Sequence, residues 1–221
     1  MDLIKHWQNL LNIHNENKNI LNAGVINAGV IDDIHIYTDK RVIYIKYPKN
    51  GGSTLFREII EPKIPINSEN YICHGFHPQK FQLWLANMTE EAIDKYFIFA
   101  IVRNPYNRLI SAFQYIYKDN KDLTFKNFLE NNISSEYNHH WIPQSYICEG
   151  MNIFDYVGKL EENFDGHAKV LLDRLGLNCN IDIPITNQSI DRKIEYDSHK
   201  RKIVNEKYKD DFLLFDYKIL N

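Results

Sequence analysis

The feature that most constrains the fold is an apolar run, Phe97–Val102, which contains no polar side chain. A run of this length is typical of a strand covered on both faces, as in the middle of a parallel sheet. Apolar residues at helical spacing follow over 107–117, so the sequence predicts a strand, a loop and a helix. With 221 residues, 44% of them hydrophobic, the chain can bury a sizeable core. We therefore predict an α/β fold: a single domain, 1–221, with a central parallel β-sheet flanked by helices.

A second strand-loop-helix unit is expected earlier in the chain. Two β-rich runs, Ile34–Tyr37 and Val42–Tyr47, flank a polar turn and predict a hairpin that leads into the sheet. The sequence then predicts a helix over Ser53–Ile60, which begins with residues that can cap a helix and ends before Pro62. Further helices are predicted at 89–96, 123–130, 164–175 and 198–208.

The loop of this earlier unit is rich in groups that bind anions. Free backbone N–H groups lie at the positive end of the helix dipole, and two glycines let an anion approach them. The candidate anion-binding residues are Lys49, Asn50, Gly51, Gly52, Ser53 and Thr54. The loop is not a Walker A motif, because its lysine precedes both glycines instead of following the last one. A Gly-Gly turn with a serine cap is the alternative interpretation.

A second candidate anion site follows the apolar run. Arg103 comes directly after the strand, at the carboxyl edge where open α/β sheets bind ligands, and its guanidinium suits a bidentate phosphate contact. Ser111 lies one to two helical turns further on and could reach the same anion. Taken alone, Arg103 could instead be an ion-pair partner and Ser111 a packing residue. Two such sites in one chain favour a ligand with two anionic groups.

Composition excludes some classes of protein. A net charge of −3 argues against a nucleic-acid partner. Three widely spaced cysteines form neither a disulfide framework nor a zinc motif. The sequence has no signal peptide and no apolar stretch long enough to form a transmembrane segment, so a cytoplasmic location is expected. Residues 1–33 receive no role.

The motifs resemble those of the sulfotransferases, specifically the carbohydrate sulfotransferase type called family 2. PKNGGST at 48–54 is similar to that family's 5′-phosphosulfate loop, and VRNPYNRLISAF at 102–113 to its 3′-phosphate motif. The segments HWIPQ at 140–144 and YVGKLE at 156–161 resemble two further family segments, and the likeness runs from about residue 42 to the C-terminus. It implies a nucleotide-kinase-like parallel sheet, with 3′-phosphoadenosine-5′-phosphosulfate (PAPS) as co-substrate and a carbohydrate hydroxyl as acceptor.

The resemblance also implies roles for single residues. The loop residues 49–54 would hold the 5′-phosphosulfate, while Arg103 and Ser111 would hold the 3′-phosphate. Asn104 departs from the acidic residue or histidine that the family often has there, which leaves both anion contacts in place. Lys49 would neutralise charge on the departing phosphate oxygen.

A base for the acceptor hydroxyl is expected in CHGFHP at 73–78, which resembles the HGH string of the heparan-type enzymes with one residue inserted. A neutral imidazole can accept a proton near pH 7. The candidates are His74 and His77, and we favour His77. A zinc site made by these two with His139 and His140 is not expected, because adjacent histidines rarely chelate one ion and no acidic partner is spaced with them. No metal is therefore predicted.

Two other functions remain open. A phosphotransferase of related topology would need magnesium-binding acids near the loop. A non-catalytic nucleotide- or glycan-binding module of the same fold would bind the nucleotide without turnover. Trp141 and Tyr137 are candidates for an acceptor cleft, although large aromatic side chains more often belong to a core.

Overall fold

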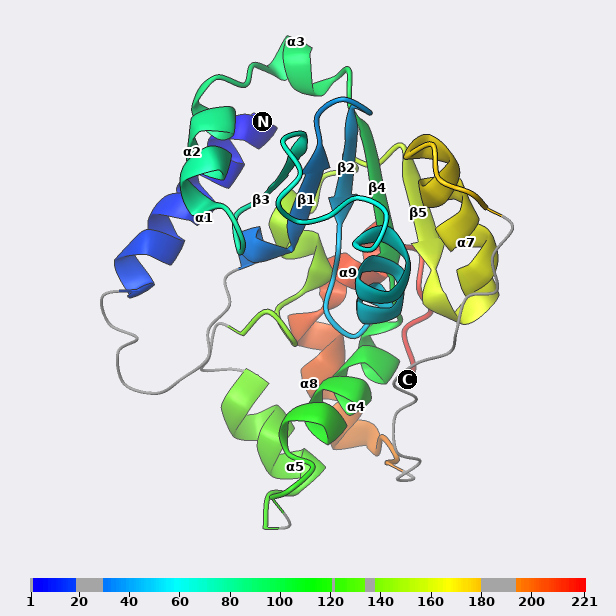
Figure 1. Ribbon diagram of the computed structural model, residues 1–221. Coiled ribbons are helices and arrows are strands. Elements are labelled where there is room, and N and C mark those ends of the chain that lie inside the picture. Colours follow the sequence, from blue (N-terminus) through cyan, green and yellow to red (C-terminus); the bar gives the residue numbers. More distant parts are fainter. Residues whose placement is uncertain (1, 19–29, 121, 134–137, 180–193) are drawn as a thin grey trace.

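The computed structural model describes residues 2–18, 30–120, 122–133, 138–179 and 194–221. At its centre lies a five-stranded sheet with the order β3-β1-β2-β4-β5 (Figure 1). The strands are β1 (Ile34–Tyr37), β2 (Val42–Ile45), β3 (Tyr71–Cys73), β4 (Phe97–Val102) and β5 (Tyr156–Lys159). β1 is antiparallel to both of its neighbours, whereas β2, β4 and β5 are parallel. Four strands, β2 to β5, therefore end at one edge, which we call the carboxyl edge.

The predicted hairpin is confirmed in register. Tyr37 pairs with Val42 and Ile34 with Ile45, so the polar residues between them form the turn. The predicted parallel strand is also confirmed, because β4 lies between β2 and β5 and is parallel to both. The sheet is mixed only through β1.

Helices surround the sheet and follow most of the predicted segments. The α-helices are α1 (Leu3–Lys18), α2 (Pro78–Ala86), α3 (Glu90–Ile93), α4 (Pro105–Ile116), α5 (Phe125–Asn127), α7 (Leu160–Arg174), α8 (Ser198–Lys207) and α9 (Lys209–Leu214). Shorter or irregular turns are η1 (Val30–Asp33), η2 (Thr54–Ile60), η3 (Phe128–Asn132) and η4 (Gln144–Cys148). Sequence patterns did not predict α1, α2, α9 or β5.

The residues of β4 explain why this strand has no polar member. Ile98, Ala100 and Val102 lie in one buried cluster with side chains of α1 and α2. Phe99 and Ile101 lie in a second cluster with side chains of η2 and α7. Because side chains alternate between the faces of a strand, both faces of β4 are covered by helices.

The N-terminal helix α1 is part of the core. Trp7 is fully buried and its Nε1 donates to the carbonyl oxygen of Ile147 at 3.0 Å. Buried apolar residues recur along one side of the helix, as in an amphipathic helix, at Leu3, Ile4, Trp7, Leu10 and Leu11. Within the described ranges, none of the helices combines the length and the apolar character that crossing a bilayer requires.

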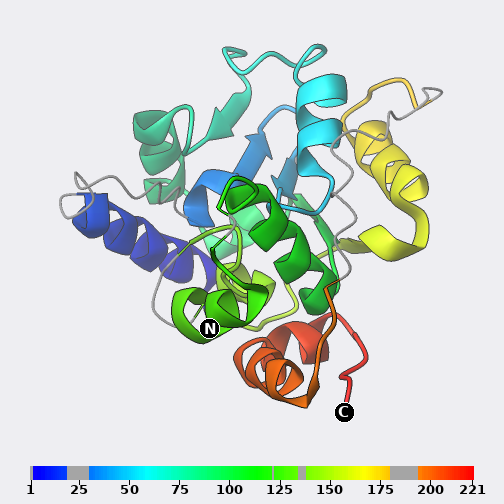
Figure 2. The same cartoon turned by 90° about the horizontal axis from the view of Figure 1, so that it is seen from below.

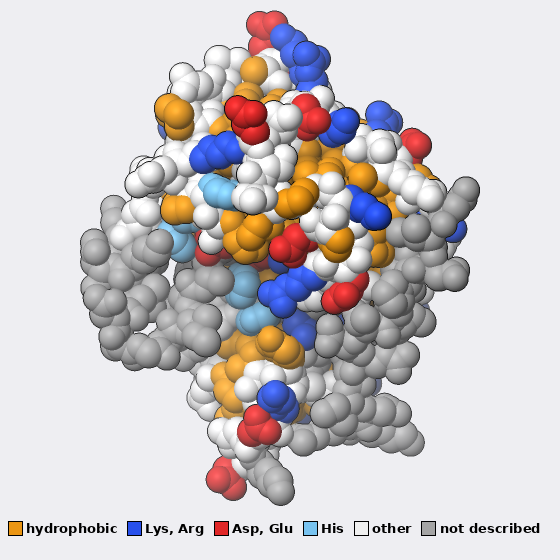
Figure 3. Space-filling view, in the orientation of Figure 1, with side chains coloured by type: hydrophobic (Ala, Val, Ile, Leu, Met, Phe, Trp, Pro, Cys, Tyr) orange, Lys and Arg blue, Asp and Glu red, His pale blue; other side chains and the backbone are white. Residues whose placement is uncertain are grey.

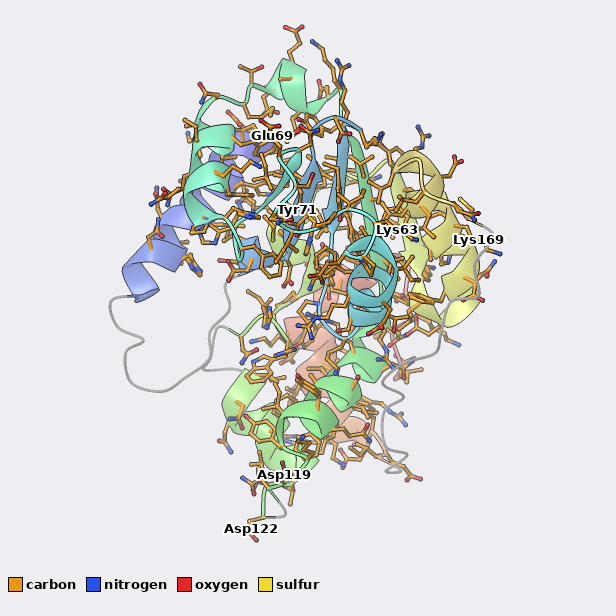
Figure 4. The ribbon with its side chains drawn as sticks, viewed as in Figure 1. Lys63, Glu69, Tyr71, Asp119, Asp122 and Lys169 are labelled. Atoms are coloured by element: carbon orange, nitrogen blue, oxygen red, sulfur yellow. The ribbon has the colours of Figure 1, made fainter. Side chains whose placement is uncertain are left out.

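A lobe of helices lies beneath the carboxyl edge of the sheet. It consists of α4, α5, η3, α8 and α9, whose apolar side chains share a third buried cluster. Figure 2, seen from below, shows α4 lying across the lower end of the sheet. Asp119 and Asp122 lie at the far tip of this lobe (Figure 4). The candidate site residues come from the carboxyl edge of the sheet and from this lobe.

Candidate active site

The glycine loop between β2 and η2 has a tight backbone, and at its two glycines there is no room for a side chain. Lys49 and Gly51 both have positive φ, 69° and 76°. A Cβ at Gly51 would lie 2.5 Å from Cε2 of Phe164, and one at Gly52 would lie 2.6 Å from Cγ of Lys46. Both glycines are therefore close-approach positions, and backbone of this kind lets successive N–H groups turn toward an anion.

A helix begins directly after the loop. The N–H of Leu55 donates to the carbonyl oxygen of Gly51 at 3.1 Å. The N–H groups of a first helical turn have no partner inside the helix and carry the positive end of its dipole. Ser53 is exposed at this end, whereas Thr54 is buried. The turn is wide, since Glu61 donates to the carbonyl oxygen five residues earlier, at Phe56. Such π-type turns are frequent at functional sites.

Lys49 is held in place by an aromatic ring. Its Nζ lies 3.9 Å from the ring centroid of Tyr115 on α4, a cation–π contact. Burial and the nearby positive charge of Arg103 lower the pKa of Lys49 to about 8. Two neighbouring cations in a half-buried position, one of which lowers the pKa of the other, form a site that favours an anion.

The two predicted anion motifs meet. Arg103 extends from the end of β4 toward the glycine loop, and its Nη1 donates to the carbonyl oxygen of Lys49 at 2.9 Å. On its other side, its Nε lies 4.0 Å from Oε1 of Glu161. Ser111 is buried on α4, the helix that also supplies Tyr115. Figure 3 shows Lys, Arg and His side chains gathered on the face between sheet and lobe.

The side chain of Asn50 attaches the glycine loop to the end of β4. Its buried side chain donates from Nδ2 to the carbonyl oxygen of Ile101 at 2.8 Å and to Oε1 of Gln144 at 2.6 Å. The same Gln144 oxygen accepts the N–H of Arg103 at 3.0 Å, and Asp211 accepts the N–H of Gln144 at 2.9 Å. The side chain of Asn50 thus fixes the loop to the end of β4, and Gln144 connects the two anion motifs.

Arg108 is a second brace, to which sequence reasoning gave no role. It is 1% exposed and donates to three carbonyl oxygens: Pro48 at 3.3 Å, Ile142 at 2.6 Å and His139 at 2.9 Å. The sequence feature that could have indicated this role is its position in the same motif, five residues after Arg103. A buried cation is costly unless it is hydrogen-bonded, so Arg108 is expected to keep these contacts. The contact with Pro48 holds α4 against the start of the glycine loop.

His74 forms a carboxylate–histidine pair. It follows β3 at the carboxyl edge, is 2% exposed, and its Nδ1 lies 2.5 Å from Oδ1 of Asp32. Its Nε2 is buried and has no hydrogen-bond partner among the described residues. A carboxylate on Nδ1 favours the tautomer whose Nε2 accepts a proton.

His77 lies one turn further along and has different contacts. It precedes α2, and its N–H donates to the carbonyl oxygen of Cys73 at 2.7 Å. Burial and the charge of Lys80 lower the pKa of His77. In the part of the chain that the structure describes, none of the hydrogen bonds or ion pairs joins the His77 side chain to a carboxylate. The two candidate bases therefore differ in their orienting partner.

A second carboxylate–histidine pair lies nearby. Nδ1 of His139 lies 3.0 Å from Oδ2 of Asp33, whose Oδ1 is 3.1 Å from Nζ of Lys46. Burial alone would raise the pKa of Asp33, but Lys46 and His139 lower it to about 2. The ring of His140 packs edge-on against that of His139, with centroids 4.3 Å apart, and lies 5.5 Å from the ring centroid of Tyr115. Burial, then His139 and Lys49, lower the pKa of His140 to about 3.

Of the two interpretations of Trp141, acceptor cleft or core, the structure supports the core. Trp141 is 1% exposed and packs edge-on against Phe128 in the lobe. Burial of the large apolar surface of the indole in the core outweighs a role in an exposed cleft. Tyr137 lies outside the described residues.

Comparison with known proteins agrees with this geometry. The model of the sulfotransferase family matches residues 32–218, which include both anion motifs, the histidine segment and all five strands. No curated protein and no solved structure is significantly similar to the chain. Since the match covers most of the 221 residues, the chain belongs to the sulfotransferase family, whose reaction is the transfer of a sulfuryl group.

Proposed function

We propose that this protein transfers the sulfuryl group of PAPS to a hydroxyl group of a carbohydrate-like acceptor. The observation that carries the proposal is the 2.9 Å contact between Arg103 Nη1 and the Lys49 carbonyl oxygen. It brings two cationic motifs, whose contacting residues are 54 positions apart in the chain, to the ends of neighbouring strands. One nucleotide with phosphates on both sides of its ribose could span them.

The donor-binding roles follow from this arrangement. The loop, from Lys49 to Thr54, would hold the 5′-phosphosulfate through its backbone N–H groups and the Lys49 ammonium. Within that loop, the buried side chain of Asn50 would support the backbone from beneath. Arg103 would hold the 3′-phosphate together with Ser111, after its side chain exchanges the Lys49 carbonyl for the anion.

The chemistry is an in-line displacement at sulfur. The acceptor oxygen forms a bond to sulfur while the bond from sulfur to the bridging phosphate oxygen breaks, and 3′-phosphoadenosine 5′-phosphate (PAP) leaves. The acceptor proton passes to an imidazole. Lys49 stabilises the negative charge that develops on the bridging oxygen. No resident metal takes part in this scheme.

Between the two candidate bases, the contacts favour His74. The Asp32 carboxylate at 2.5 Å holds its Nδ1–H, which leaves Nε2 to accept the proton and stabilises the imidazolium that results. His77, which sequence reasoning favoured, has no comparable partner among the described residues. Its assignment stays a prediction, tested by the turnover of His74→Ala and His77→Ala variants.

The acceptor class rests on exposed aromatic side chains. Tyr115 is 59% exposed beside Lys49, and Phe76 is 48% exposed next to the histidines that follow β3. Aromatic faces this exposed offer stacking surfaces for the apolar faces of sugar rings. They support a carbohydrate acceptor without identifying the sugar.

A thermal-shift titration tests the proposal. PAP should raise the melting temperature, ATP should not, and Arg103→Ala should lose the PAP effect. Lys126→Ala is the matched control, because Lys126 is an exposed cation of the lobe whose partner is Glu130. Transfer of labelled sulfate from PAPS to a glycan panel then tests turnover. Stabilisation by ATP alone would indicate a phosphotransferase, and PAP binding without transfer to any acceptor would indicate a binding module.

A further inference from the structure

Three potential metal ligands from separate parts of the chain converge beside β3. They are His14 on α1, Asp32 in η1 and His74 after β3, and one nitrogen or carboxylate oxygen from each lies within 4.8 Å of the others. Sequence reasoning rejected a zinc site at His74 because no acidic partner was spaced with it. The fold supplies that partner from 42 residues away.

The contacts within this group, which we call the α1–β3 cluster, are close. Asp32 Oδ1 lies 2.5 Å from His74 Nδ1, and the rings of His14 and His74 are nearly perpendicular with centroids 4.8 Å apart. The imidazole of His74 is 2% exposed, and its Nε2 has no hydrogen-bond partner among the described residues. His74 thus presents a buried imidazole with one nitrogen unpartnered among the described residues, beside a carboxylate and a second imidazole.

We propose that the α1–β3 cluster binds one divalent transition-metal ion, with Zn²⁺ as the best fit. Imidazole nitrogens and a carboxylate oxygen are zinc ligands, with bonds of about 2.0–2.2 Å and water in the fourth position. Tetrahedral bonds of that length separate the ligand atoms by about 3.4 Å. In the structure the Asp32–His74 contact of 2.5 Å is shorter than this spacing and other separations extend up to 4.8 Å, so metal binding requires the side chains to rotate. Two nitrogen ligands disfavour Mg²⁺ and Ca²⁺, which prefer oxygen.

Two of the three residues of the cluster are partly accessible. His14 and Asp32 are half-buried, whereas His74 is enclosed. The ion would therefore bind from the solvent side of α1, and its ligands would tie that helix to the end of β3.

Metal binding has a consequence for turnover that rests on the proposed function. If His74 is the base, an ion on its imidazole removes the proton acceptor, and the acceptor hydroxyl is no longer deprotonated. Zinc should then inhibit the transferase, although the proposed reaction itself uses no metal.

Zinc binding is measured directly, without donor or acceptor, by competition of the purified protein with a chromogenic chelator. The unmodified protein should take up about one Zn²⁺ per chain, and His14→Ala or His14→Gln should weaken the affinity at least tenfold. The matched control is His199→Ala, which removes a histidine that pairs with Glu130 on the lobe and should leave the affinity unchanged. Melting curves of each variant verify folding. No uptake by the unmodified protein, or equal affinity in both His14 variants, would overturn the proposal.

Turnover separates this proposal from the proposed function. Each protein is assayed with Zn²⁺ and with chelator, and the rate with Zn²⁺ is divided by the rate with chelator. Zinc should lower the rate at least tenfold in the unmodified protein and in His199→Ala, and less than twofold in His14→Ala. Zinc uptake at the cluster without inhibition would support the metal site and overturn His74 as the base.

Discussion

Replacing Gly51 by alanine tests whether the glycine loop is fixed by packing against α7. A Cβ there would lie 2.5 Å from Cε2 and 2.9 Å from Cζ of Phe164. Gly150 provides a matched control, because its φ of 74° is close to the 76° of Gly51 but nothing lies within 4 Å of its Cβ position. The two alanine variants therefore share backbone strain and differ in the steric clash.

The expected loss of stability follows from these two contributions. A left-handed conformation costs an L-residue about 1–2 kcal/mol relative to glycine. Overpacking costs about 1–3 kcal/mol more, and it acts only at Gly51. Gly150→Ala should thus lower the free energy of unfolding by about 1–2 kcal/mol, and Gly51→Ala by about 2–5 kcal/mol.

Urea unfolding of both variants measures this difference, provided that the m-values are unchanged. Combining Gly51→Ala with Phe164→Leu should recover part of the loss, as a coupling of about 0.5–3 kcal/mol in a double-mutant cycle. PAP binding should weaken in Gly51→Ala and stay unchanged in Gly150→Ala. Equal losses of stability in the two variants, with no coupling to Phe164, would refute the view that the ring shapes the loop.

Three further predictions concern titration and the base. Because burial and Arg103 lower the pKa of Lys49 to about 8, PAP affinity should fall by up to about tenfold per unit of pH above 8, and Lys49→Arg should remove that dependence; calorimetric titration at several pH values measures both. The pKa of Asp33 is lowered from 3.8 to about 2, so its stabilising effect is present above about pH 4 and is lost as the pH falls toward 2; Asp33→Asn should flatten the urea-unfolding profile in that window. Asp32→Asn should lower kcat at least tenfold with little change in KM, since it removes the group that orients His74; steady-state kinetics that show an unchanged kcat would contradict this role.

The parts of the fold that the sequence predicted are those set by short-range patterns. The hairpin of β1 and β2 follows from two β-rich runs around a polar turn, and β4 from a run without polar residues. Arg103 was placed at the carboxyl edge because it directly follows β4. Each of these inferences needs only neighbours in the chain, for which residue spacing is informative.

Other elements depend on contacts that spacing does not reveal. α1 is stabilised by burial of Trp7 against η4, more than a hundred residues away. β5 was not predicted because its four residues, only one of them buried, carry a weak pattern. The side chains that brace the site, Gln144 and Arg108, bond to atoms of distant segments, which no local pattern encodes. Tertiary contacts decided all of these cases.

The histidines illustrate how much a long-range partner changes an assignment. His74 and His77 are the same residue type and lie three positions apart, so the sequence alone offers no physical reason to prefer one of them as the base. Two consecutive aspartates before β1 supply the difference, because Asp32 pairs with His74 while Asp33 pairs with His139. Neighbouring side chains on one short turn point in different directions, so a single segment orients imidazoles from two distant parts of the chain. A shift of η1 would therefore disturb both pairs together, whereas a change at His77 would disturb neither.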